Sequence, residues 1–316
     1  MKKTLVAIAV SSAALTSVSA FAADDTVNFD VYGNIQLVYA DSKDNDSKIA
    51  DNGSTFGFQG STAVSDDLTA FFKYELELDA DDKTRNEESN SGVDLDQAYV
   101  GLQGSFGKVQ VGSFDTPYNN AIQDSLDQFE YLGAHTASLT SEGDTIAFYS
   151  PSIYGFEFQT AIQVKGSADD STTSSDADRK SDNGTASQMV LKYSVDALTV
   201  ALGYDNLANV LGKEDTSTYG LNVGFQVNPA LSVSFQYEDE TDVAETFGLG
   251  ARFNYGSGDL YGTVQTVDQE GSAADYDMYG IGATYNLASN VYVYAEYGQV
   301  DEAEDKVTAV GATYLF

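Results

Sequence analysis

The chain has 316 residues and no cysteine, and its 49 acidic residues against 15 Lys and Arg give a formal net charge of −34. A chain this acidic lacks the basic surface that nucleic-acid binding requires, so a nucleic-acid partner is excluded. With one histidine and no cysteine, it can form neither disulfides nor a sulfur- and nitrogen-rich zinc site, and nothing in it implies a cofactor or a metal.

The first 22 residues are predicted to be a secretion signal. Lys2 and Lys3 precede a short apolar stretch over residues 5–15, and Ala20-Phe21-Ala22 forms a small-x-small cleavage site. The apolar stretch is too short to be a membrane-spanning helix. Residues 23–316 are therefore treated as one exported domain.

Sixteen β-strands are predicted from residue 27 to the end of the chain, because apolar and polar residues alternate along each of them. In 231–238, for example, Leu231, Val233 and Phe235 alternate with serine and glutamine. An even strand number suits a closed antiparallel barrel of the outer membrane. The predicted strands cover 27–40, 54–64, 67–78, 93–104, 107–114, 144–151, 154–164, 186–195, 197–205, 217–228, 230–238, 245–255, 259–267, 276–286, 290–300 and 306–316.

The predicted connections alternate between short and long. The short ones have one to three residues, and the long ones are acidic: 41–53, 79–92, 115–143, 165–185, 206–216, 239–244, 268–275 and 301–305. This alternation places turns at one end and loops at the other, as in outer-membrane barrels. A soluble β-sandwich would explain the alternating residues but not this asymmetry. The apolar face should point outward, since Lys or Arg facing the bilayer midplane costs about 2–4 kcal/mol.

The chain ends on a strand rather than on a polar tail. In 306–316 the residues Val310, Tyr314 and Phe316 share one face with Thr308 and Ala312. Pairing of this strand with 27–40 would close the barrel and remove both free edges. A barrel of about 16 strands leaves an aqueous channel, and the longest connection, 115–143, is the natural obstruction in it.

Six short segments of the chain are similar to general porins of Gram-negative bacteria. They are 31–35 (VYGNI), 54–60 (STFGFQG), 97–102 (QAYVGL), 112–117 (GSFDTP), 149–151 (YSP) together with Gly155, and 310–316 (VGATYLF). The resemblance implies a 16-stranded transmembrane β-barrel with an inward-folded third loop. It also implies a homotrimer that forms a diffusion pore in the outer membrane.

The resemblance further implies roles for particular residues. Asp115, Asp124, Asp127 and Glu130 are expected to be the acids of the constriction. The lumen wall is expected to carry Lys73, Glu75, Glu77 and Arg252, and the chain end, Tyr314 with Phe316, resembles the family's signal for barrel assembly.

The chain departs from many porins at the wall arginines. Thr55, Gln97, Ser113 and Glu142 stand where those relatives place arginine, and the chain has only three Arg, at 85, 179 and 252. A less positive wall predicts a preference for cations. The acidic loops are interpreted as solvated surface that divalent cations could bridge to lipopolysaccharide phosphates.

Three functions compete, and none of them is enzymatic. A general diffusion pore comes first. A pore selective for oligosaccharides would need aromatic residues along the lumen, for which Tyr32, Tyr99, Tyr292 and Tyr294 are the candidates. A non-conducting adhesin or structural barrel comes third. Catalysis by His135 with Ser138 or Ser141 is disfavoured, because the chain has no Gly-x-Ser-x-Gly motif.

Overall fold

The computed structural model describes residues 27–43, 45–81, 92–137, 143–164, 185–207, 216–271, 274–300 and 305–316. The predicted signal sequence, Arg85, Arg179, Ser138, Ser141 and Glu142 lie outside these residues. The described elements are β1 (Asn28–Ser42), β2 (Asn45–Asp51), β3 (Ser54–Ser65), β4 (Leu68–Leu78), β5 (Val93–Gly104), β6 (Gly107–Ser113), the short helix η1 (Asn119–Gln123), β7 (Thr145–Tyr149), β8 (Phe156–Val164), β9 (Thr185–Val195), β10 (Leu198–Leu207), β11 (Thr216–Asn228), β12 (Leu231–Glu240), β13 (Ala244–Asn254), β14 (Asp259–Gln269), β15 (Tyr276–Ala288), β16 (Val291–Val300) and β17 (Asp305–Leu315).

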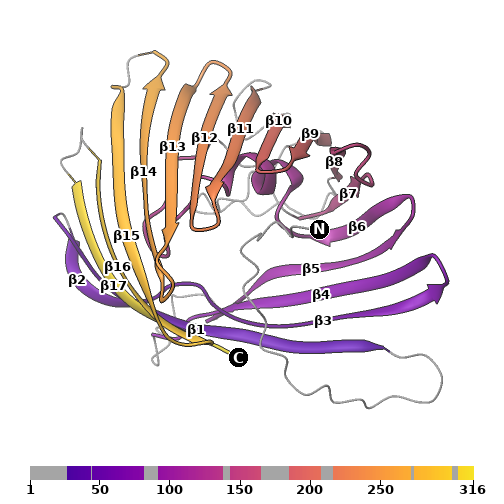
Figure 1. Ribbon diagram of the computed structural model, residues 1–316, viewed down its shortest axis with the longest axis horizontal. Coiled ribbons are helices and arrows are strands. Elements are labelled where there is room, and N and C mark those ends of the chain that lie inside the picture. Colours follow the sequence, from indigo (N-terminus) through magenta and orange to yellow (C-terminus); the bar gives the residue numbers. More distant parts are fainter. Residues whose placement is uncertain are drawn as a thin grey trace, which may run out of the picture.

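The strands form one closed antiparallel sheet (Figure 1). Consecutive strands pair along the chain, and β1 pairs with β17 from Asn34 opposite Leu315 to Ser42 opposite Val307. Both β2 and β3 pair with β1, β3 along its first half and β2 along its second. They therefore count as one strand interrupted at Asn52 and Gly53, and the barrel has sixteen strands, as predicted.

The segment 41–53 was predicted to be a long loop, and that prediction is wrong. β1 continues to Ser42 and β2 begins at Asn45, so the connection between them is a tight one. The predicted loop 239–244 likewise shrinks to the turn 241–243. Both segments are rich in Asp, Asn, Ser or Glu, and polar composition alone cannot tell a loop from a strand pair that extends beyond the apolar zone.

Apolar side chains cover one face of the sheet. Leu249, Ile281 and Val310 are each more than half exposed, at 57%, 64% and 52%. The residues next to them along the chain point to the opposite face and are buried or half-buried, as the two-residue period of a strand requires. The predicted orientation, with the apolar face outward, agrees with this pattern, which would be unusual on a soluble monomer.

The end of the chain lies directly against the first strand. Gly33 N–H donates to the Phe316 carbonyl and Phe316 N–H donates to the Gly33 carbonyl, both at 3.0 Å. A Cβ added to Gly33 would lie 2.7 Å from Cζ of the Phe316 ring, so glycine leaves the space that the ring fills. The predicted closure of the barrel by 306–316 and 27–40 is thus confirmed.

Candidate functional site

The connection after β6 is described from Phe114 to Ala137, and we name residues 114–137 the third-loop segment. It contains η1, which lies against β10 and β11 and is drawn in purple in Figure 1. The segment contacts the polar face of the sheet, opposite the exposed apolar residues. Hydrogen bonds and apolar contacts fix it there at several points.

Glu296, on β16, is the first of these points. Its carboxylate accepts hydrogen bonds from the backbone N–H groups of Glu130 at 2.6 Å and of Tyr131 and Leu132 at 3.0 Å each. The Tyr261 hydroxyl donates a further bond, at 2.7 Å. Glu296 is only 3% exposed. Hydrogen bonds to an ionised acceptor are stronger than neutral ones, so this carboxylate is a firm attachment for the loop backbone.

Glu238, on β12, is a second attachment, and it holds residues near the start and at the end of the segment. Its carboxylate accepts from the Tyr118 hydroxyl at 3.0 Å, Gln123 Nε2 at 2.8 Å and the backbone N–H of Ala137 at 3.1 Å. The residue is fully buried. The sequence did not identify Glu238 and Glu296 as the anchors of the loop, because their partners on the third-loop segment are more than 100 residues away along the chain.

His135 belongs to a third attachment. Its backbone N–H donates to Gln265 Oε1 and its carbonyl accepts from Gln265 Nε2, both at 2.8 Å. The Tyr276 hydroxyl lies 2.9 Å from Nδ1 of the ring. Burial lowers the pKa of His135, partly opposed by Glu240, so the imidazole is neutral at pH 7. These contacts give the histidine a structural role.

Apolar side chains of the segment pack onto glycines of the wall. A Cβ at Gly248 on β13 would lie 2.1 Å from Cδ2 of Leu126, and one at Gly280 on β15 would lie 2.2 Å from Cζ of Phe129. Leu126 is fully buried. Absence of a side chain at these wall positions therefore lets the segment lie close to the sheet.

The four acids predicted for the constriction all lie on this segment, in two different settings. Asp115 accepts a hydrogen bond from Gln97 Nε2 at 2.9 Å, and Glu130 accepts one from the Tyr292 hydroxyl at 2.8 Å. Asp124 and Asp127 are exposed to solvent. The structure thus places two acids in contact with the wall and two with part of their side chains exposed to solvent.

The local environment raises the pKa of each acid. Surrounding protein raises the pKa of Asp124 to about 6, and the Asp115 and Asp127 carboxylates contribute in the same direction. Water still reaches this side chain, so it can exchange its proton with solvent. Desolvation is also the main cause of the raised pKa values of Asp115, Asp127 and Glu130.

The predicted wall residues lie on the polar face, and most of their charges are compensated. Lys73 Nζ is 2.8 Å from Glu75 Oε1, while Glu77 is exposed one step further along β4. Arg252 lies 3.3 Å from Asp259, and its Nη1 donates to the carbonyl of Gln128 at 3.1 Å. Arg252 is thus a further attachment for the third-loop segment.

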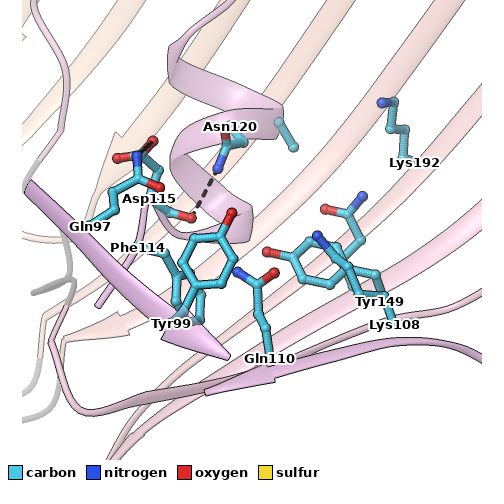
Figure 2. Close-up of a pocket in the computed structure, with 11 residues that line it drawn as sticks. Gln97, Tyr99, Lys108, Gln110, Phe114, Asp115, Asn120, Tyr149 and Lys192 are labelled. Carbon is cyan, nitrogen blue, oxygen red and sulfur yellow. Dashed lines mark hydrogen bonds between the residues drawn. The ribbon is translucent and has the colours of Figure 1, made fainter. Parts of the chain in front are cut away.

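A polar cavity of about 280 Å³ lies between the third-loop segment and the wall (Figure 2). Gln97 and Asp115 lie on one side of it and Lys108 and Lys192 on the other. The remaining lining comes from aromatic and amide side chains, including Tyr99, Gln110, Asn120 and Tyr149. Sequence reasoning missed Lys108 and Gln110, whose alternation on β6 was a signal that they face inward.

Among the described residues, no helix is both long and apolar enough to span a membrane. The same residues contain no group of three or more His, Asp or Glu side chains placed to hold a metal ion.

Comparisons with known proteins agree with this architecture. The family model described as Gram-negative porin matches residues 8–305. A protein from a Halomonas species named "Monosaccharide porin" is 32% identical over 378 aligned residues that cover 100% of both chains. Outer membrane porin F of Salmonella typhimurium is 24% identical, again over 100% of both chains.

Two solved structures share the fold. OmpF of Salmonella typhi, in complex with daunomycin, has a TM-score of 0.74 at 20% identity and covers 91% of this chain and 97% of its own. An anion-selective porin from Comamonas acidovorans has a TM-score of 0.74 at 18% identity and covers 92% of this chain and 100% of its own.

Proposed function

The chain belongs to the Gram-negative porin family, a family of outer-membrane channel proteins rather than enzymes, and we propose that it lets small hydrophilic solutes and ions diffuse passively through a water-filled pore. The closed sixteen-stranded barrel with one polar face carries this proposal. A barrel of about that size leaves an aqueous channel when nothing fills it.

The proposal includes a constriction made by the third-loop segment, folded into the barrel. Its support is the set of contacts with Glu238, Glu296 and Gln265, which belong to the polar face of three different strands. The exposed Asp124 and Asp127 would then face the narrowest part of the water path, with Asp115 and Glu130 at its margins.

We also propose that the pore conducts cations in preference to anions. Four carboxylates lie on the third-loop segment, and it has no Lys or Arg. On the wall, Glu75 and Asp259 compensate Lys73 and Arg252. Lys108 and Lys192 give a smaller positive contribution on one side. The summed field should concentrate cations in the pore, an effect that weakens as salt is added.

We propose a homotrimer, as the resemblance to general porins implies. Its support is an outward-facing aromatic cluster on β1, β3 and β4, in which the rings of Phe58 and Tyr74 stack at 5.4 Å and Phe29 lies 6.1 Å from Phe58. Molar mass in detergent, by light scattering, tests this assembly.

Binding of lipopolysaccharide through divalent cations at the acidic loops is also proposed. Loss of bound lipopolysaccharide when the divalent cations are chelated would support it.

A saccharide-selective pore is the second candidate function. The polar cavity favours it, and one relative carries the name "Monosaccharide porin". The four tyrosines considered for a sugar path lie on three strands, and two of them already use their hydroxyls within the protein. The Tyr292 hydroxyl donates to Glu130, and the Tyr294 hydroxyl accepts from Asn52. They give little support to an extended oligosaccharide path.

Liposome swelling and single-channel recording test the proposed function together. Purified protein should let small neutral sugars enter liposomes at rates that fall with solute size, and it should give stepwise currents in planar bilayers. An adhesin or structural barrel would give neither swelling nor current, and that result would contradict the proposal.

A further inference from the structure

The cavity between the third-loop segment and the wall has the chemistry of a binding site. Its two cations come from separate strands, β6 and β9, and its acid, Asp115, comes from the loop (Figure 2). Cavities for drug-sized ligands measure about 300–1,000 Å³. At about 280 Å³ this one has room for a solute the size of a single sugar ring.

The two lysines have no acidic partner among the described residues. Lys108 instead lies over the ring of Tyr149, with Nζ 3.9 Å from the ring centroid. Lys192 is the register partner of Glu157 on β8, but the two do not form an ion pair. Ammonium groups held in a partly dry site without a counter-charge attract an anion.

A buried acceptor at the same place is also without a partner. Gln110 is 4% exposed, and its Oε1 accepts no hydrogen bond from the described residues. A buried carbonyl oxygen left without a donor is unfavourable, so a ligand that brings a donor would relieve this cost. A hydroxyl group is such a donor, and the neighbouring amides of Gln97 and Asn120 can bond to further hydroxyls.

We propose that this cavity is a binding subsite for a monosaccharide that carries one carboxylate, such as a hexuronate. The carboxylate lies between Lys108 and Lys192, and ring hydroxyls bond to Gln110 and to Asp115. The single acid on the opposite side favours a monoanion with hydroxyl groups over a phosphate dianion, because Asp115 repels the second charge and accepts from a hydroxyl. The subsite rests on the proposed function, since the solute must enter through the pore.

Single-channel recording with added solutes tests this proposal. Sodium glucuronate, at fixed ionic strength, should interrupt the wild-type current in a concentration-dependent way. Glucose should need at least about a tenfold higher concentration for the same effect, because it lacks the charge-assisted bonds. Sodium acetate and inorganic phosphate are the other two probes. Equal effects of glucuronate and acetate, or a stronger effect of phosphate, would overturn the proposal.

Substitution of the two lysines tests whether glucuronate acts at this cavity. Lys108→Gln combined with Lys192→Gln should raise the half-effective glucuronate concentration about tenfold or more, whereas Lys192→Arg should keep most of the effect. Lys306→Gln, on β17 and away from the cavity, removes one positive charge at another place and should leave the glucuronate response unchanged. An unchanged response in the double variant overturns the proposal.

The two proposals fail in different ways. A wild-type channel that conducts but does not respond to glucuronate overturns the subsite and leaves the diffusion pore standing. A protein that gives no current overturns the pore, and the subsite with it.

Discussion

Buried carboxylates hold the third-loop segment in place against the wall. Glu296 receives four hydrogen bonds and is almost entirely shielded from water. A buried charge is tolerated only when it is paired or well hydrogen-bonded. Three of its four donors are consecutive backbone N–H groups of the third-loop segment, so the acid and the loop depend on one another.

Glu296→Gln should loosen the third-loop segment. The amide keeps one acceptor oxygen, but its NH₂ group faces N–H or O–H donors from which the carboxylate accepted hydrogen bonds. At least one hydrogen bond to a charged group, worth about 1.5–3 kcal/mol, is therefore lost. Single-channel currents should become noisier and differ in mean conductance. Glu245→Gln, on β13 and exposed, is the matched control. Currents identical to wild type in both variants would refute this role.

Asp124 should make the selectivity depend on pH. Its pKa is raised to about 6, so the carboxylate gains its proton, and loses its charge, as the pH falls through about 6. An ordinary aspartate would do so near pH 4. Cation preference, measured as reversal potential from pH 8 to pH 5, should therefore decline with a midpoint near 6. Asp124→Asn should remove this midpoint, and Asp66→Asn, on an exposed turn, should keep it.

At the scale of elements, the third-loop segment and the glycines of the wall fit one another. Leu126 and Phe129 occupy space that exists only because Gly248 and Gly280 carry no side chain. Interiors packed at protein density leave little room for an added methyl group, so these positions should be intolerant of larger residues.

Gly248→Val should displace the segment while the barrel persists. The new side chain would clash with Leu126 at a site where the added Cβ alone comes within 2.1 Å. We expect altered conductance with unchanged β-sheet content by circular dichroism. Gly224→Val on β11 is the matched control, because nothing lies within 4 Å of its added Cβ. Equal effects of the two substitutions would count against the packing argument.

The strands could be predicted from the sequence far better than the contacts between them. The alternation in 231–238 and 306–316 placed β12 and β17 within a few residues, because burial of one face imposes a two-residue period. β2 was missed because its polar residues carry no such period. The contact between Glu130 and Glu296 spans 166 residues of sequence, and no local pattern marks it.

At the scale of the whole molecule, closure joins the two ends of the described chain. The pairing of β1 with β17 leaves no free sheet edge between them, and Phe316 extends it by two backbone hydrogen bonds to Gly33. The pairing of the first strand with the last closes the open sheet into a barrel.

Deletion of Phe316 should impair assembly more than conductance. It removes both bonds to Gly33 and the ring that lies over that glycine, while the lining of the pore stays the same. Folded barrel in outer membranes, measured by the heat-dependent shift in gel mobility, should fall sharply. Phe316→Tyr keeps the ring and should assemble. Normal accumulation of the deletion variant would show that this residue has no role in assembly.

The site itself was only partly predictable. The four acids were named because the chain resembles general porins over the start of the third loop, and they lie on the third-loop segment. Lys108 and Gln110 were missed because their function depends on Lys192 and Asp115, which the fold brings to them from other elements. Charge and alternation show which face a side chain lies on, but not what lies across the lumen from it.

The reversal potential of the wild-type channel under a potassium chloride gradient tests the central claim most directly. A water-filled pore with uncompensated carboxylates at its constriction should conduct in steps and give a potential of the sign set by potassium permeation, and that potential should shrink at higher salt as the charges are screened. A potential of the sign set by chloride, or the absence of any current, would contradict the account.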